Sequence, residues 1–152
     1  MEITFSLRLP RDAATVPFVR SICGDAMTRL GVRKTCQDDV ALAVTEACAN
    51  VVRHAGGISE YRVAVQLSED WCHIRVMDAG QGIDAAKLSR AMPDGRDDTG
   101  RGLLLMRLLV DRIDFESDPE AGTIVHLRKR LDFEDGSVIH ELSPGPSARS
   151  KP

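Results

Sequence analysis

The sequence predicts an α+β fold, a two-layer α/β sandwich in which one mixed β-sheet carries its helices on one face. The spacing of apolar residues predicts elements in the order strand, helix, helix, strand, strand, long loop, helix, strand, strand. The middle and final strands form hairpin-like pairs, and they do not alternate one for one with helices as in a doubly wound sheet. A chain of 152 residues has room for one hydrophobic core.

The first half of the chain predicts two strand regions around a pair of helices. Apolar and polar side chains alternate over residues 3–9, which is typical of a half-buried strand. Apolar residues at helical spacing predict a helix over 13–30, stopped by Gly31, and a second helix over 36–54. Residues 61–67 and 71–77 then follow as two strands around a short turn.

Glycine and proline interrupt residues 78–101, where we expect a long loop with a short helix near 85–91. A loop of this length in a small domain usually has a function. A helix over 102–110 and strands over 112–116 and 123–131 complete an expected domain of residues 1–132. Residues 133–152 contain much Gly, Ser and Pro, which predicts a loosely ordered tail.

Composition narrows the classes of function. The net charge of −3 gives no basic footprint for nucleic acid or an anionic membrane, so we expect direct binding to neither. No apolar stretch is long enough to span a bilayer, and the first residues lack the pattern of a signal peptide, which predicts a cytoplasmic protein. The four cysteines form no CxxC pair, which favours reduced, buried thiols over disulfides or zinc ligands.

Two polar residues of the second helix share one stripe. Glu46 and Asn50 are four positions apart, and apolar residues flank both. The carboxylate can take a proton, and the amide oxygen can bind a hard cation such as Mg²⁺. A solvated polar stripe on an amphipathic helix has the same pattern, so this helix alone leaves both interpretations open.

An acid ends the strand before the long loop. Asp78 is followed by Gly80 and Gly82, which let the backbone turn tightly and approach a flat ligand. A carboxylate in an apolar cleft can accept a hydrogen bond from an exocyclic amine such as that of adenine. An ordinary Asp-Gly turn is the alternative.

Further glycines precede the third helix. Gly100, Arg101, Gly102 and Leu103 lead into it, and amides at the start of a helix can bind phosphate. One GxG is a weak signal and is neither a Walker A loop nor a dinucleotide fingerprint. Thr123, after Gly122 at the start of the last strand, indicates nothing by itself.

The order and spacing of these four elements resemble the N, G1 and G2 boxes and the terminal Gly-Thr of the Bergerat-fold (GHKL) ATPases. Within that superfamily the chain is similar to the small anti-sigma factor serine/threonine kinases, whose N box reads much like residues 46–55. The resemblance covers about residues 1–132.

This resemblance implies a site for ATP and Mg²⁺. Asn50 would coordinate Mg²⁺, and Glu46 would be the general base on the attacking serine hydroxyl. Asp78 would accept the adenine amino group, with Thr123 helping through water. Gly80 and Gly82 would form the floor under the adenine. The backbone amides that meet the phosphates would be those of Gly100, Arg101, Gly102 and Leu103.

The resemblance also implies partners. Such a kinase sequesters a sigma factor, regulating transcription, and phosphorylates a serine or threonine of a STAS-like anti-anti-sigma factor. We expect a homodimer whose contact uses the N-terminal strand and the nearby sheet surface. The acidic residues Asp94, Asp97 and Asp98 depart from the family, which tends to carry a basic residue just before the glycines. They favour an alternative, a nucleotide-gated protein-binding switch without phosphotransfer.

Overall fold

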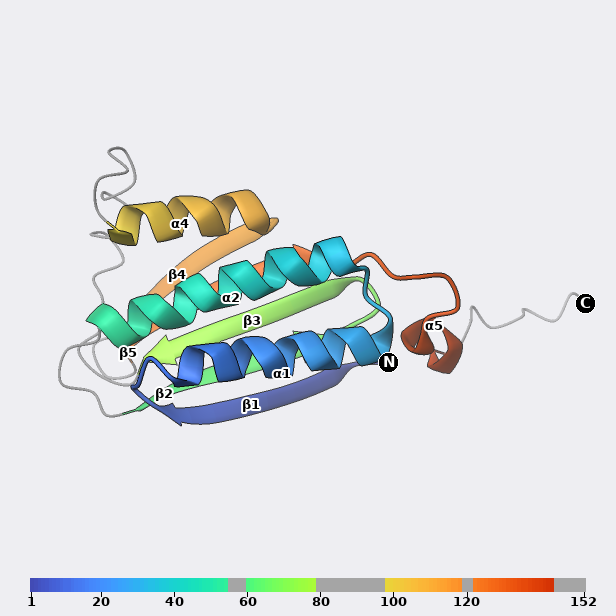
Figure 1. Ribbon diagram of the computed structural model, residues 1–152, viewed down its shortest axis with the longest axis horizontal. Coiled ribbons are helices and arrows are strands. Elements are labelled where there is room, and N and C mark those ends of the chain that lie inside the picture. The colour runs from blue at the N-terminus through green and yellow to red at the C-terminus, as the bar shows by residue number, and fades with distance from the viewer. Residues whose placement is uncertain (55–59, 79–97, 119–121, 144–152) are drawn as a thin grey trace, which may run out of the picture.

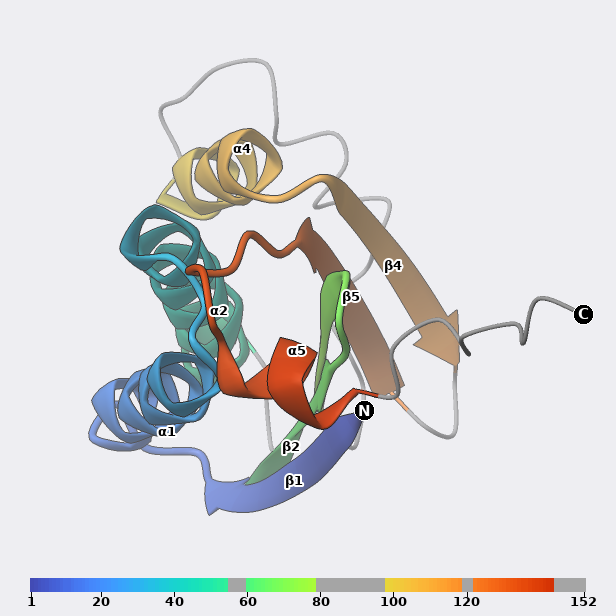
Figure 2. The same ribbon diagram turned by 90° about the vertical axis from the view of Figure 1, so that its right-hand side faces the viewer.

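The computed structural model describes residues 1–54, 60–78, 98–118 and 122–143. The elements along the chain are β1 (Ile3–Pro10), α1 (Thr15–Leu30), α2 (Lys34–His54), β2 (Glu60–Leu67), β3 (Trp71–Asp78), α4 (Asp98–Leu109), β4 (Arg112–Asp118), β5 (Gly122–Arg130) and α5 (Val138–Leu142). Figures 1 and 2 show two layers, with α1, α2 and α4 over one face of the sheet. The α+β two-layer prediction is confirmed; the short helix expected near 85–91 lies outside the described residues.

The sheet has the strand order β1-β2-β3-β5-β4, and each described pair is antiparallel. The expectation of a mixed sheet is therefore wrong. Two helices connect β1 to β2 and return the chain to the end where β1 finished, so Pro10 pairs with Glu60 and the two strands run in opposite directions. β3 and β4 run in the same direction, but β5 lies between them and pairs antiparallel with both.

The core lies between the helices and the inner face of the sheet. β1 alternates as expected, with its odd-numbered residues facing the core, and α1 buries residues at helical spacing. Gly31 ends α1 with a φ of 82°, and a Cβ there would lie 2.7 Å from Ser137 Cβ. Both the backbone conformation and the lack of space therefore require glycine at this position.

The first part of the expected tail is packed rather than loose. Val32 and Phe133 form an isolated β-bridge, and the backbone of Glu134 donates to the carbonyl of Gly31. Ile139 of α5 is fully buried in the core, at the end of the sandwich near the N-terminus (Figure 2). The segment up to α5 is therefore docked on the core, through the Phe133 bridge and the buried Ile139.

All four cysteines, Cys23, Cys36, Cys48 and Cys72, are free and buried, as the sequence predicted. Burial raises the pKa of the Cys23 thiol to about 12 and raises the pKa of Cys48, which lies between Glu46 and Asn50 in sequence. These thiols therefore remain protonated and do not act as nucleophiles. Among the described helices, none has both the length and the apolar character needed to cross a membrane.

Candidate functional site

Helix α2 presents Glu46 and Asn50 along one stripe, as expected from their spacing. The opposite side of the helix is held in the core by Val44, Ala47, Cys48 and Val51, all nearly inaccessible. Glu46 is half-buried, whereas Asn50 is only 5% exposed although its side chain is polar. A buried amide needs a hydrogen-bonding partner. The alternative interpretation, a solvated polar stripe, therefore does not fit Asn50.

Helix α4 packs against this stripe through Gly102. A Cβ built on Gly102 would lie 2.7 Å from Glu46 Oε2 and 3.7 Å from Asn50 Oδ1. The two side-chain oxygens therefore converge on one point of the α4 backbone, which only glycine leaves open. Carboxylate and amide oxygens are ligands that Mg²⁺ accepts, so this donor set fits a magnesium ion beside a proton acceptor.

The start of α4 differs from the prediction. The helix begins at Asp98 rather than at Gly102, so Gly100 lies in its first turn and Gly102 is its fifth residue. In an α-helix only the first four amides lack a partner within the helix. The amides of Gly102 and Leu103 are therefore engaged in the helix, and Leu103 is fully buried in the core. The structure instead shows Gly102 as the point of close approach to Glu46.

The second part of the candidate site is a buried carboxylate between two neighbouring strands. Asp78, at the end of β3, is 1% exposed, and its Oδ1 accepts a hydrogen bond of 2.9 Å from the backbone amide of Thr123 on β5. Thr123 is itself 2% exposed. Burying a carboxylate is costly, so this arrangement fits a group that receives N–H donors from a ligand. This contact of Thr123 with Asp78 is made by its backbone, and the expected help of Thr123 through water stays a prediction.

These residues gather at one end of the molecule. Figure 1 shows that the carboxyl end of α2, the beginning of α4 and the arrowhead of β3 lie together, opposite the end that holds α5. Gly80, Gly82, Asp94 and Asp97 lie outside the described residues. Of the remaining predicted residues, Arg101 is exposed and lines a cavity of about 210 Å³ with Glu46 and Gly102.

The sequence interpretation missed two of the described residues that line this cavity, Leu105 and Arg53. The Nη2 of Arg53 lies 3.5 Å from Asn50 Oδ1. The spacing could have identified Arg53, because residues three and seven positions along a helix share one face with Asn50 and Glu46.

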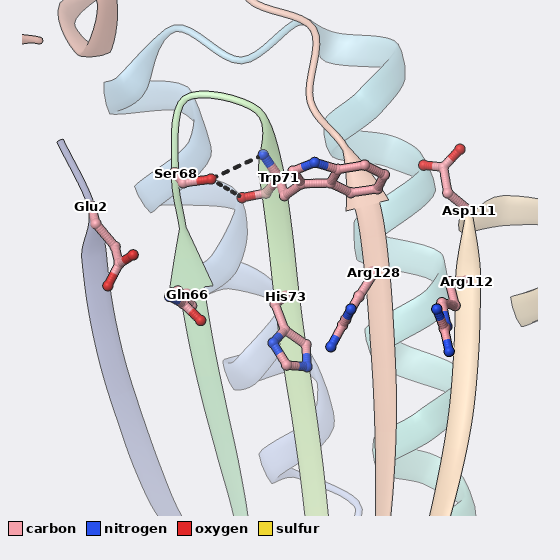
Figure 3. Close-up of a pocket in the computed structure, with 8 residues that line it drawn as sticks. All are labelled: Glu2, Gln66, Ser68, Trp71, His73, Asp111, Arg112 and Arg128. Atoms are coloured by element: carbon pink, nitrogen blue, oxygen red, sulfur yellow. Dashed lines mark hydrogen bonds between the residues drawn. The ribbon is translucent and has the colours of Figure 1, made fainter.

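A different cavity, of about 500 Å³, lies on the sheet face that the helices leave uncovered (Figure 3). None of the predicted site residues lines it; its lining is Glu2, Gln66, Ser68, Trp71, His73, Asp111, Arg112 and Arg128. His73 Nε2 lies 3.1 Å from His126 Nδ1, and the two rings are stacked. Burial lowers the pKa of His73, and the charges of Arg128, His126 and Arg75 lower it further. We place the candidate site at Glu46, Asn50 and Asp78 because the buried acceptors Asn50 and Asp78 are there.

The chain is similar to known proteins over most of its length. Residues 9–129 match the model of the histidine kinase-like ATPase domain family. The serine-protein kinase RsbW of Halalkalibacterium halodurans is 32% identical in an alignment of 139 residues that covers 84% of this chain and 83% of that protein. The RsbW of Bacillus cereus is 28% identical over 147 residues, covering 88% of this chain and 91% of that protein.

Two solved structures share the fold. The RsbU and RsbW domains of a Mycobacterium tuberculosis protein superpose with a TM-score of 0.66 at 20% identity, covering 85% of this chain and 32% of that chain. The SiaB–SiaC complex of Pseudomonas aeruginosa gives a TM-score of 0.58 at 12% identity, covering 83% of this chain and 88% of the matched chain.

Proposed function

Because this chain belongs to the histidine kinase-like ATPase domain family, and within it to the anti-sigma factor serine/threonine kinases of the Bergerat (GHKL) fold, we propose that it binds ATP with Mg²⁺ and phosphorylates a protein serine or threonine. One observation carries the proposal. Glu46 Oε2 and Asn50 Oδ1 converge on the backbone of Gly102, where α2 and α4 meet. A proton acceptor and a metal ligand are thereby held together by two packed helices.

Each residue has a role in the proposed reaction. Asn50 Oδ1 would hold Mg²⁺, which would supply positive charge near the phosphates. Glu46 accepts the proton of the attacking serine hydroxyl as the new O–P bond forms and the bond from the γ-phosphorus to the ADP oxygen breaks. Asp78 accepts the adenine amino group, beside its hydrogen bond from the Thr123 amide. Gly80 and Gly82 are proposed to shape the adenine floor.

The proposed partners follow from the relatives. Curated relatives are named serine-protein kinase RsbW, and the SiaB–SiaC structure is a complex of two proteins. We propose that this chain sequesters a sigma factor and phosphorylates a STAS-like anti-anti-sigma factor. We also propose a homodimer through β1. This strand is at the edge of the sheet, so its outer backbone groups can pair with a second strand.

Two variants separate transfer from binding. Glu46→Gln should keep nucleotide and partner binding while phosphate transfer falls by roughly 10²–10⁴, the usual contribution of positioned proton transfer. Asn50→Ala should lose Mg²⁺-dependent binding as well as transfer, because Asn50 would supply the protein ligand to the metal. The assay is transfer of labelled phosphate to the partner recovered by pull-down from the native host, beside calorimetric titration of each variant.

The same assay tests the second candidate function. The acidic residues Asp94, Asp97 and Asp98 favour a switch that holds nucleotide without transferring phosphate. Tight ATP binding by the parent without transfer to its recovered partner would support the switch. A Glu46→Gln variant that transfers at the parental rate would remove the base assignment.

A further inference from the structure

The cavity on the uncovered face of the sheet is separate from the proposed nucleotide site, because the sheet itself lies between it and the helices (Figures 2 and 3). Its volume of about 500 Å³ is in the range of small-molecule pockets. Trp71 and His73 stand on this face of β3, about 7 Å apart along the strand. Arg128 of β5 is the cross-strand partner of His73. The cavity thus places an aromatic ring and a guanidinium one step apart along two paired strands.

Trp71 forms an apolar wall of the cavity. It is 41% exposed and is the one exposed large apolar side chain on the described strands. Figure 3 shows its ring reaching from β3 toward β5. The guanidinium of Arg130 lies 5.8 Å from the ring centroid, a cation–π contact that favours this position of the indole. An indole held at the edge of a cavity offers a stacking surface to a flat ring.

Arg128 is exposed, and its guanidinium makes no hydrogen bond or ion pair with another of the described residues. Its neighbour Arg112, directly opposite on β4, is instead paired with Asp114 at 2.7 Å. Asp111, another lining residue, accepts the backbone amide of Arg130 at 2.6 Å. Like charges directly opposite each other destabilise a sheet, so an anion that binds the open guanidinium fork of Arg128 would also relieve this repulsion.

The centre of the cavity is positive although two acids, Glu2 and Asp111, also line it. Figure 3 shows these acids at opposite sides of the cavity, with the His73 ring between Gln66 and Arg128. Burial lowers the pKa of His73, and so do the charges of three basic neighbours: Arg128, His126 and Arg75. A positive centre beside an open guanidinium favours the negatively charged end of a ligand.

We propose that this cavity binds a small aromatic carboxylate, with its ring against Trp71 and its carboxylate on Arg128. A single ring that bears a carboxylate spans the step of about 7 Å between the two side chains, once a hydrogen bond of about 2.9 Å is included. The planar carboxylate matches the fork of the guanidinium. This proposal does not depend on the proposed kinase function.

The test uses the fluorescence of Trp71, which is the one tryptophan of the chain and therefore reports on this cavity alone. The intact protein is titrated with benzoate, cyclohexanecarboxylate, benzamide and inorganic phosphate, with calorimetry beside each titration. We expect benzoate to bind with a Kd of about 1 mM or below. Cyclohexanecarboxylate cannot stack and should bind about twofold to tenfold more weakly. Benzamide lacks the charge and phosphate lacks the ring, so each should bind at least about tenfold more weakly.

Variants then test the two contacts. Arg128→Gln should weaken benzoate binding by about tenfold to a hundredfold, because a hydrogen bond between charged groups is lost, and Arg128→Lys should recover part of the loss. Trp71→Leu, measured by calorimetry, should bind benzoate and cyclohexanecarboxylate equally. The matched control is Arg62→Gln, because Arg62 is an exposed arginine of β2 on the same face of the sheet and does not line the cavity. This control should bind benzoate as the parent does.

Several results would overturn the proposal. A parent that shows no saturable binding of benzoate has no such site. Equal affinity for benzoate and benzamide removes the charge contact, and equal affinity for benzoate and phosphate removes the ring contact. If Arg62→Gln loses as much affinity as Arg128→Gln, the effect belongs to the charge of the whole face and not to this cavity. The unfolding temperature of each variant without ligand shows whether a lost affinity reflects a damaged sheet.

Discussion

Replacing Gly102 by alanine would place a methyl group against the carboxylate that we propose as the base. The added Cβ would lie 2.7 Å from Glu46 Oε2, 3.6 Å from Glu46 Cδ and 3.7 Å from Asn50 Oδ1. Non-bonded heavy atoms rest at about 3.5 Å or more, so the carboxylate must retreat by about 0.8 Å while Asn50 can stay in place. The substitution therefore moves one functional group selectively.

The fold should tolerate this change. Gly102 is inside α4 and is not among the described glycines with positive φ, so alanine fits its backbone and favours the helix by about 1 kcal/mol. The group that must move is the free end of a flexible side chain. We expect an unfolding temperature equal to or above that of the parent. Phosphate transfer should fall by about tenfold to a hundredfold, since a displacement of about 1 Å at a reacting group has an effect of that size.

The measurement combines single-turnover transfer of labelled phosphate with thermal unfolding. Gly24→Ala is the matched control, because Gly24 is also inside a helix, α1, and a Cβ there meets nothing within 4 Å. This variant should gain similar stability and keep the parental rate. Parental transfer by Gly102→Ala would refute the assigned role of Glu46. If the Gly102→Ala variant is unfolded, the argument that the Glu46 carboxylate can move away from the added methyl group is refuted.

Three further predictions concern other parts of the molecule. Asp78→Asn should still accept the hydrogen bond from the Thr123 amide through its side-chain oxygen, but its amide NH2 would then face the adenine amino group, donor against donor. ATP binding should therefore weaken by about fivefold to 150-fold in calorimetry, and unchanged affinity would make the adenine assignment wrong. The lowered pKa of His73 means that the folded state binds fewer protons than the unfolded state below about pH 6.5. The resulting stability is present above that pH and is lost as the pH falls through the folded pKa, and His73→Gln should flatten the acid side of a plot of unfolding temperature against pH; an unchanged acid side contradicts this. Light scattering at tens of micromolar should give the mass of a dimer, and a monomeric mass would remove the proposed pairing through β1.

Local patterns were sufficient to predict most elements of the fold. The alternation along residues 3–9 and the helical spacing before Gly31 each report burial on one face, and both elements are found within two residues of the expected bounds. The antiparallel sheet was not predicted, because strand order depends on which strand lies between β3 and β4, and no local pattern encodes that. Likewise, Ile139 gave no periodic signal in a short polar segment, yet it anchors α5.

The candidate site shows the same division between local and long-range information. The shared stripe of Glu46 and Asn50 follows from helical geometry and was predicted, as was the acid at the end of β3. The contact between Gly102 and Glu46 depends on how α4 docks on α2, so the sequence indicated the glycine but gave a different reason for it. The spacing places Arg53 on the helix face of Glu46 and Asn50, but only the docking of α4 shows that this face borders a cavity.

The antiparallel order of the sheet also has a consequence for folding. The pairs β2–β3, β4–β5 and α1–α2 each join neighbours in sequence, whereas β3–β5 and α2–α4 join the first part of the chain to the last. Local pairs form quickly, and long-range pairs form after the larger loops close. Asp78 meets Thr123 across one of these late junctions, and Glu46 meets Gly102 across the other. Neither part of the chain alone contains the whole proposed site. A nucleotide bound there would contact both parts, so it would raise the free energy needed to separate them during unfolding.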